Sequence, residues 1–123
     1  MLLENRTVVV TGAAMGIGRA AALCCAEVGA QIVLADIDKS GLDETFRDIE
    51  AIGGQVTSRL VDVSNACEVE KLMTIAFEEY GRIDALINCA GILEGACIPV
   101  DELEESVWER VMDTNLKLSL IHI

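Results

Sequence analysis

The chain has 123 residues, 52% of them hydrophobic, and a formal net charge of −12 at pH 7. This length provides one domain with a modest core. The negative charge argues against nucleic acid or an anionic membrane as a partner, and the longest uncharged run, residues 7–18, is too short to span a bilayer. Five cysteines without a Cys-x-x-Cys pair, and an N-terminus without a signal pattern, predict a cytoplasmic protein with reduced thiols and no metal site.

Apolar runs and helical periodicity alternate along the chain. The strands are expected at residues 6–11, 31–36, 55–61 and 83–88. The first helix is expected at 17–28 and the second at about 40–52, with Ser40 as its N-cap. The third helix is expected to end at the C-terminal glycine Gly81, and the last to begin near Asp101. Alternating strand and helix units require parallel strands with right-handed crossovers. The sequence therefore predicts an α/β fold with a doubly wound parallel sheet in the strand order 3-2-1-4.

The spacing of apolar residues predicts which face each helix buries. In the first helix these residues are Ile17, Ala20, Ala21, Cys24 and Val28. In the second they are Leu42, Phe46 and Ile49, and in the third Val69, Leu72, Met73, Ala76, Phe77 and Tyr80. In the last helix the candidates for facing the sheet are Leu103, Val107, Val111 and Leu118.

A glycine-rich turn with the spacing Gly-x-x-x-Gly-x-Gly directly follows the first strand, at residues 11–18. Gly12 lets the backbone leave the strand in a conformation that a Cβ would disfavour. Gly16 and Gly18 leave room for a dinucleotide and for the facing strand. The helix that follows directs its unpaired N–H groups, including that of Ile17, at phosphates. A tight turn without a ligand would also need these glycines, so the context decides between the two.

An acidic residue at the end of the second strand favours the nucleotide interpretation. Asp36 lies 18 residues beyond Gly18, where an acid is expected to bind an adenosine ribose. A solvated aspartate at a strand end is the alternative. A carboxylate would repel the 2′-phosphate of NADP, so the predicted cofactor is NAD. Asp38 adds to this repulsion, and Lys39 is the residue that could reduce it.

Four motifs in this order resemble the short-chain dehydrogenase/reductase family over residues 5–117. They are Thr11 to Gly18, Asp62-Val63, Asn88-Cys89-Ala90-Gly91, in which Cys89 replaces an asparagine of the family, and Asn115. The resemblance implies that Asn115 is catalytic. It implies cofactor contacts by Gly12, Met15, Gly16, Ile17, Gly18, Asp36, Asp62, Val63, Asn88, Ala90 and Gly91. Gly12, Asp36, Asp62 and Asn88 all end strands, which is where ligands bind in such sheets.

The resemblance also implies hydride transfer between NAD(H) and a small secondary alcohol or ketone, by a protein that forms homo-oligomers. The serine and the Tyr-x-x-x-Lys of the family have no counterpart after Asn115. We therefore interpret residues 1–117 as an NAD(P)-binding Rossmann domain that is incomplete at its C-terminal side. Residues 118–123 form a tail that departs from the family pattern, and this chain alone is expected to be inactive.

Two other functions are alternatives to this one. A non-catalytic NAD-binding module stays open. An epimerase or dehydratase on the related extended scaffold is disfavoured by the glycine spacing and by the segment at residues 88–91. The apolar strand at 83–88 would be left as an exposed edge, which predicts poor solubility or marginal folding. His122 has no partner pattern and is assigned neither a metal nor a catalytic role.

Overall fold

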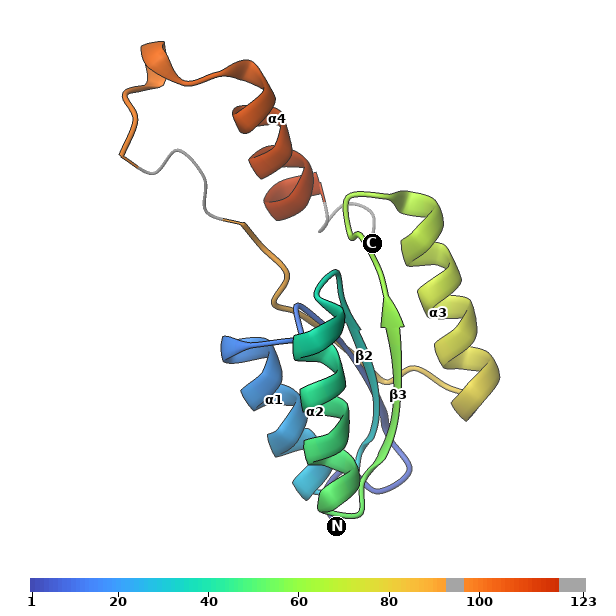
Figure 1. The fold of residues 1–123 in the computed structure, drawn as a ribbon. Helices are drawn as coiled ribbons and strands as arrows, with labels where there is room; N and C mark the ends of the chain where they lie inside the picture. The colour runs from blue at the N-terminus through green and yellow to red at the C-terminus, as the bar shows by residue number, and fades with distance from the viewer. Residues whose placement is uncertain (93–96, 118–123) are drawn as a thin grey trace.

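The computed structural model describes residues 1–92 and 97–117 (Figure 1). The strands are β1 (Thr7–Thr11), β2 (Gln31–Asp36), β3 (Gln55–Leu60) and β4 (Ala85–Asn88). The helices are α1 (Gly16–Glu27), α2 (Lys39–Ala51), α3 (Ala66–Tyr80) and α4 (Glu105–Met112), with a 3-10 turn η1 (Val100–Glu102) before α4 and a π-helical turn η2 (Asp113–Lys117) after it. All four strands are parallel, in the order β3-β2-β1-β4. The predicted fold class and strand order are confirmed.

The central strands are buried on both faces. Every residue of β1 and the four middle residues of β2 are buried, as expected for near-continuous apolar runs in a parallel sheet. The register pairs Val9 with Val33 on one side and with Leu86 on the other. Helices α1 and α2 cover one face of the sheet and α3 covers the other (Figure 1).

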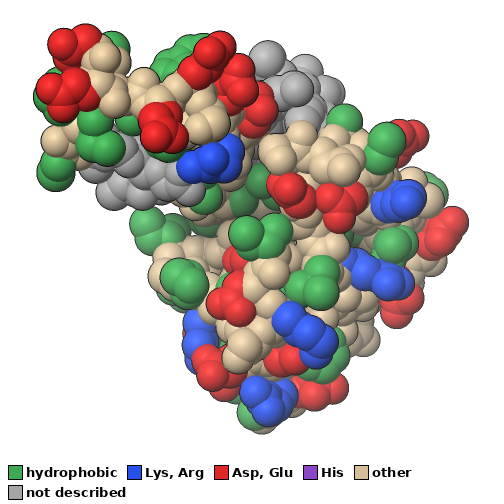
Figure 2. All heavy atoms as spheres, turned by 45° about the horizontal axis from the view of Figure 1, so that its top comes forward, with side chains coloured by type: hydrophobic (Ala, Val, Ile, Leu, Met, Phe, Trp, Pro, Cys, Tyr) green, Lys and Arg blue, Asp and Glu red, His purple; other side chains and the backbone are tan. Residues whose placement is uncertain are grey.

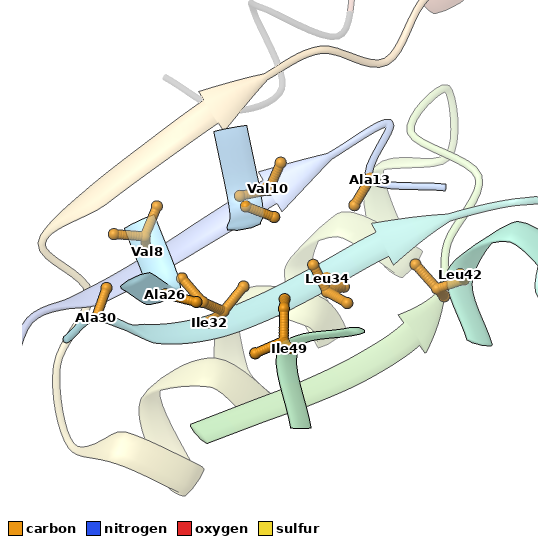
Figure 3. Packing of buried hydrophobic residues seen from close by; sticks show 10 residues of the cluster. Val8, Val10, Ala13, Ala26, Ala30, Ile32, Leu34, Leu42 and Ile49 are labelled. Carbon is orange, nitrogen blue, oxygen red and sulfur yellow. The ribbon is translucent and has the colours of Figure 1, made fainter. Parts of the chain in front are cut away.

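Alternating residues of β1 and β2 divide the core into two clusters, since successive side chains of a strand point to opposite faces. Figure 3 shows the cluster under α1 and α2, in which Val8, Val10, Ile32 and Leu34 meet residues of both helices. The helices contribute Ala22, Ala26, Leu42 and Ile49. On the opposite face, Val9, Val33 and Ala35 pack against α3 through Val69, Leu72 and Ala76. The predicted buried faces of α2 and α3 are thus confirmed, apart from Phe77, which is exposed.

The predicted face of α1 is wrong. The buried residues are Gly18, Ala22 and Ala26, whereas Ile17 is 81% exposed and Ala20 and Cys24 are exposed too. These small buried residues, four apart, bring the helix close to the sheet, and Gly18 lies directly against the turn that follows β1. The geometry of the turn therefore fixes the rotation of α1, rather than the larger apolar side chains.

Two helix boundaries also differ from the prediction. The N-cap of α2 is Asp38, whose side chain accepts a hydrogen bond from the N–H of Gly41, and not Ser40. The expected helix from Asp101 is a short 3-10 turn, and α4 begins only at Glu105 because the backbone of Leu103 and Glu104 is extended.

Helix α4 also fails to cover the sheet as predicted. It stands away from the strands (Figure 1), and none of its residues is buried. Leu103, Val107 and Val111 are half-buried, while Leu118 lies outside the described residues. No helix within residues 1–92 and 97–117 is long and apolar enough to cross a membrane.

The carboxylate of Asp84 joins the beginnings of β1 and β4. It accepts hydrogen bonds from the backbone N–H of Thr7 at 2.9 Å, from Arg82 Nε at 2.7 Å and from Arg6 at 3.1 Å. β4 begins at Ala85 and not at residue 83, although the backbone N–H of Asp84 also donates to the carbonyl of Thr7 at 2.9 Å. Hydrogen bonds from Arg82, then from Thr7 and Arg6, hold the pKa of Asp84 well below its ordinary value of 3.8.

We predict that Asp84→Asn lowers the free energy of unfolding at pH 7. Since the pKa is lower in the folded state, the stabilisation by Asp84 is present above the unfolded pKa, near 4, and is lost as the pH falls through the folded pKa. The difference between wild type and variant should shrink steadily below about pH 4. Urea unfolding between pH 2 and 7 measures this. The control Asp101→Asn, on the exposed turn η1, should leave the profile unchanged.

Candidate cofactor-binding cleft

A cleft of about 750 Å³ opens at the carboxyl ends of the strands. Its volume is within the range of small-molecule sites, about 300–1,000 Å³. Figure 2 turns this end toward the viewer and shows the surface hollowed below α4, with acidic side chains gathered over η1 and α4. The cleft lies where strand order reverses, between β1 and β4, which is the expected position for a ligand in an open α/β sheet.

The cleft brings together the predicted cofactor-binding residues with one exception, Asn88. Its walls contain Gly12, Met15, Gly16, Ile17, Gly18, Asp36, Asp62, Val63, Ala90 and Gly91. Three separate loops and the start of α1 contribute these residues, so the folded chain collects in one place motifs that are far apart in sequence.

The glycines of the turn have two different uses. A Cβ on Gly12 would lie 2.5 Å from the carbonyl carbon of Cys89, and a Cβ on Gly18 would overlap the carbonyl of Gly12. These two glycines therefore allow β1, α1 and the segment after β4 to meet. Gly16 has a φ of +56° and faces open space, with no atom within 4 Å of a Cβ placed there. Gly16 is thus the glycine that leaves room for a ligand.

Two backbone donors hold the Asp36 carboxylate at the cleft wall. One oxygen accepts from the N–H of Ala14, in the glycine turn, and the other from the N–H of Asp38, both at 3.0 Å. The side chain is half-buried. Lys39 instead forms an ion pair with Asp43, 2.9 Å away and one turn further along α2. Backbone N–H groups therefore orient the Asp36 carboxylate. Hydrogen bonds to an ionised acceptor such as this one are stronger than those between neutral groups.

Asp62 and Val63 form the wall on the side of β3. Val63 is buried, whereas Asp62 is exposed to the cleft. One oxygen of Asp62 accepts from both the N–H and the hydroxyl of Ser64, at 3.0 and 2.6 Å. These bonds fix the carboxylate on the cleft wall.

The side chain of Asn88 supports the cleft from behind instead of lining it. The buried hydroxyl of Thr11 donates to Asn88 Oδ1 and accepts from the N–H of Ala90, both at 3.4 Å. Thr11 thereby ties the ends of β1 and β4 together. Thr11 belongs to the glycine-turn motif but is not among the site residues predicted from the sequence, although its position directly before the first glycine was an available signal.

Asn115, the predicted catalytic residue, makes two hydrogen bonds to the backbone of Ile92. Its Oδ1 accepts from the N–H of Ile92 and its Nδ2 donates to the carbonyl of Ile92, each at 2.8 Å. The carboxamide thus pairs with Ile92 as a neighbouring strand would. In this structure Asn115 joins η2 to the segment after β4, and it is not part of the cleft wall.

Several residues that line the cleft were not predicted from the sequence. Arg110, Asp113 and Thr114 of α4 and η2 line it, as do Ile37, Val61 and Ile92. These residues come from a segment whose placement no periodicity predicts, because α4 is not packed on the sheet. Among residues 1–92 and 97–117, no group of three or more His, Cys, Asp or Glu could hold a metal, and the five cysteines are free thiols.

Comparison with known families decides the classification. The chain matches the model of the short chain dehydrogenases over residues 6–122. It belongs to the short-chain dehydrogenase family. Relatives include a 3-oxoacyl-(acyl-carrier-protein) reductase of Thermotoga maritima, 35% identical over 95% of this chain and 47% of that protein. Another is 3beta-hydroxysteroid dehydrogenase 2 of Eggerthella lenta, 34% identical over 94% of this chain and 44% of that protein.

Solved structures agree with the fold. A metagenomic short-chain oxidoreductase in complex with NADP superposes with a TM-score of 0.93 at 31% identity, over 98% of this chain and 54% of that one. Actinorhodin polyketide ketoreductase with NADPH gives 0.88 at 30% identity, over 94% and 43%. The chain thus spans about half the length of its relatives. The family is one of NAD(P)-binding oxidoreductases that act on small molecules, and these neighbours give no preference for NAD over NADP.

We predict that Gly18→Ala destabilises the fold even without a ligand. Helix propensity alone would make alanine more favourable by about 1 kcal/mol, so a loss isolates the clash with Gly12. Such overpacking costs about 1–3 kcal/mol. Urea unfolding measures it, with Ala20→Gly at an exposed position of the same helix as the propensity control. A Gly18→Ala variant as stable as wild type would contradict the close approach.

Proposed function

We propose that this chain is the cofactor-binding part of an NAD-dependent dehydrogenase that transfers hydride between NAD(H) and a secondary alcohol or ketone. The observation that carries the proposal is the Asp36 carboxylate, held by two N–H groups on the wall of a cleft that begins at the glycine turn. A carboxylate in this position can accept hydrogen bonds from both ribose hydroxyls.

The residues of the cleft fit a dinucleotide from end to end. The open side of Gly16 and the N-terminus of α1, with the N–H of Ile17, would bind the pyrophosphate. Asp36 would bind the adenosine ribose, and Asp62 with Val63 would contact the adenine. When bound, NAD supplies the hydride acceptor. The protein's part in this region is to bind and orient it, with Ala90 and Gly91 lining the side toward β4.

The charges near Asp36 favour NAD over NADP. Asp36 and Asp38 both line the cleft, and a 2′-phosphate would add about two negative charges beside them. Two basic side chains of α1 and α2 form ion pairs within the protein: Arg19 pairs with Glu44 and Asp48, and Lys39 pairs with Asp43.

A second candidate is a non-catalytic NAD-binding module. The observation that favours it is the carboxamide of Asn115, the one family catalytic residue recognised in the sequence, which is bonded through both its polar atoms to Ile92. The 123-residue chain is expected to be inactive under both candidates, so the protein encoded by the complete reading frame is assayed with NAD and secondary alcohols: turnover supports the dehydrogenase, and binding without turnover supports the module. The cytoplasmic location and the homo-oligomeric state of a longer protein are proposals that rest on the resemblance and on the free thiols.

We predict that the chain binds NADH at least about tenfold more tightly than NADPH, which corresponds to about 1.4 kcal/mol. Asp36→Asn should weaken NADH binding and reduce this ratio to near one. It removes the negative charge, and it places an amide donor where Ala14 or Asp38 requires an acceptor. Isothermal titration calorimetry measures both affinities. Glu50→Gln, the same charge change on the exposed end of α2, is the control and should keep the ratio. Equal affinity of wild type for both cofactors would contradict the preference.

A further inference from the structure

A buried threonine of α2 contacts the glycine turn from outside the cleft. The side chain of Thr45 is fully buried, and its hydroxyl lies 2.9 Å from the carbonyl oxygen of Ala13 and 3.1 Å from that of Gly41. The bond to Gly41 is the usual one of a helical threonine to the preceding turn of its own helix. The contact with Ala13 instead connects two elements far apart in sequence. Since a hydroxyl has one proton, the nearer acceptor is the carbonyl of the glycine turn.

The carbonyl of Ala13 depends on this hydroxyl. Ala13 is fully buried and Ala14 nearly so. Within the described residues, Thr45 is the donor that reaches this carbonyl. A buried carbonyl that loses its donor bears the full cost of desolvation. Removing the hydroxyl should therefore shift the peptide group of Ala13 toward another partner.

The next peptide group of the turn, that of Ala14, is held by β2 and α2. The N–H of Ala14 donates to Asp36, at the end of β2. Gly41 packs so closely on Ala14 that an added Cβ would lie 2.9 Å from its Cβ and its carbonyl oxygen. β2 and the first turns of α2 thus fix two successive peptide groups, and these set the direction in which the chain continues into Met15 and Gly16.

We propose that Thr45 is a positioning residue for cofactor binding, acting through the Ala13 carbonyl on the part of the turn that faces the phosphates. Thr45 does not line the cleft, so it touches no cofactor atom. The inference rests on the proposed function and deepens it: the phosphate-binding turn is held in shape by the helix that follows the ribose-binding acid. The two ends of the adenosine diphosphate site are thereby coupled through α2.

The test compares Thr45→Val, which keeps the shape and removes the hydroxyl, with Thr45→Ser, which keeps the hydroxyl. Isothermal titration calorimetry of the 123-residue chain with NADH gives the affinity, and thermal unfolding without NADH gives the stability separately. We expect Thr45→Val to weaken NADH binding about three- to tenfold, the value of one hydrogen bond, and Thr45→Ser to bind within about twofold of wild type.

Thr7→Val is the matched control. Thr7 is equally buried, and its hydroxyl donates to Gln31 at 3.0 Å at the opposite end of the sheet. This variant should lose stability without losing affinity. An unchanged affinity of folded Thr45→Val, or an equal loss in Thr7→Val, would overturn the inference. If Thr45→Val does not fold, Thr45→Ala against Thr45→Ser repeats the comparison with the hydroxyl as the one difference. Wild type that binds no NADH would overturn the proposed function itself, and this inference with it.

Discussion

The close contact between the turn after β1 and the backbone after β4 is the constraint on which the site depends. Because Gly12 has no side chain, the backbone of Cys89 and Ala90 packs directly against it. Gly18 packs in the same way against the carbonyl of Gly12. Thr11 adds hydrogen bonds across the same junction. Any larger residue at these glycines would separate β1, α1 and β4 at the point where their ends form the cleft floor. The glycine motif is therefore a packing requirement first, and only Gly16 leaves its space to a ligand.

The turn is also held from the other side. β2 contributes Asp36 and α2 contributes Thr45, which bond to the N–H of Ala14 and the carbonyl of Ala13. The acid that would recognise the ribose thus has a structural bond as well, so that its charge cannot be changed without loosening the turn. These bonds hold the turn in place without a ligand, and such preorganisation lowers the cost of binding.

Much of this could be predicted from the sequence because the signals are local. Runs such as Val8 to Val10 and Ile32 to Ala35 predict buried parallel strands, and the glycine spacing with Asp36 predicts where they meet a ligand. The predictions that were wrong concern features that depend on tertiary contacts. Ile17 is exposed because the turn sets the rotation of α1, and α4 follows two extended residues that no periodicity reveals. Thr45 carries no signal in sequence, since a helical threonine usually bonds within its own helix.

The most direct test of the account is to map amide chemical shifts of the ¹⁵N-labelled chain while NAD is added. We expect the shifts to concentrate at residues 12–18, 36–38, 62–64 and 88–92, which surround the cleft. A second hollow of about 400 Å³, bordered by Gly29 and Gly53, lies at the opposite end of the sheet. Shifts confined to that end, or no shifts at saturating NAD, would contradict the claim that the carboxyl ends of the strands form a dinucleotide site.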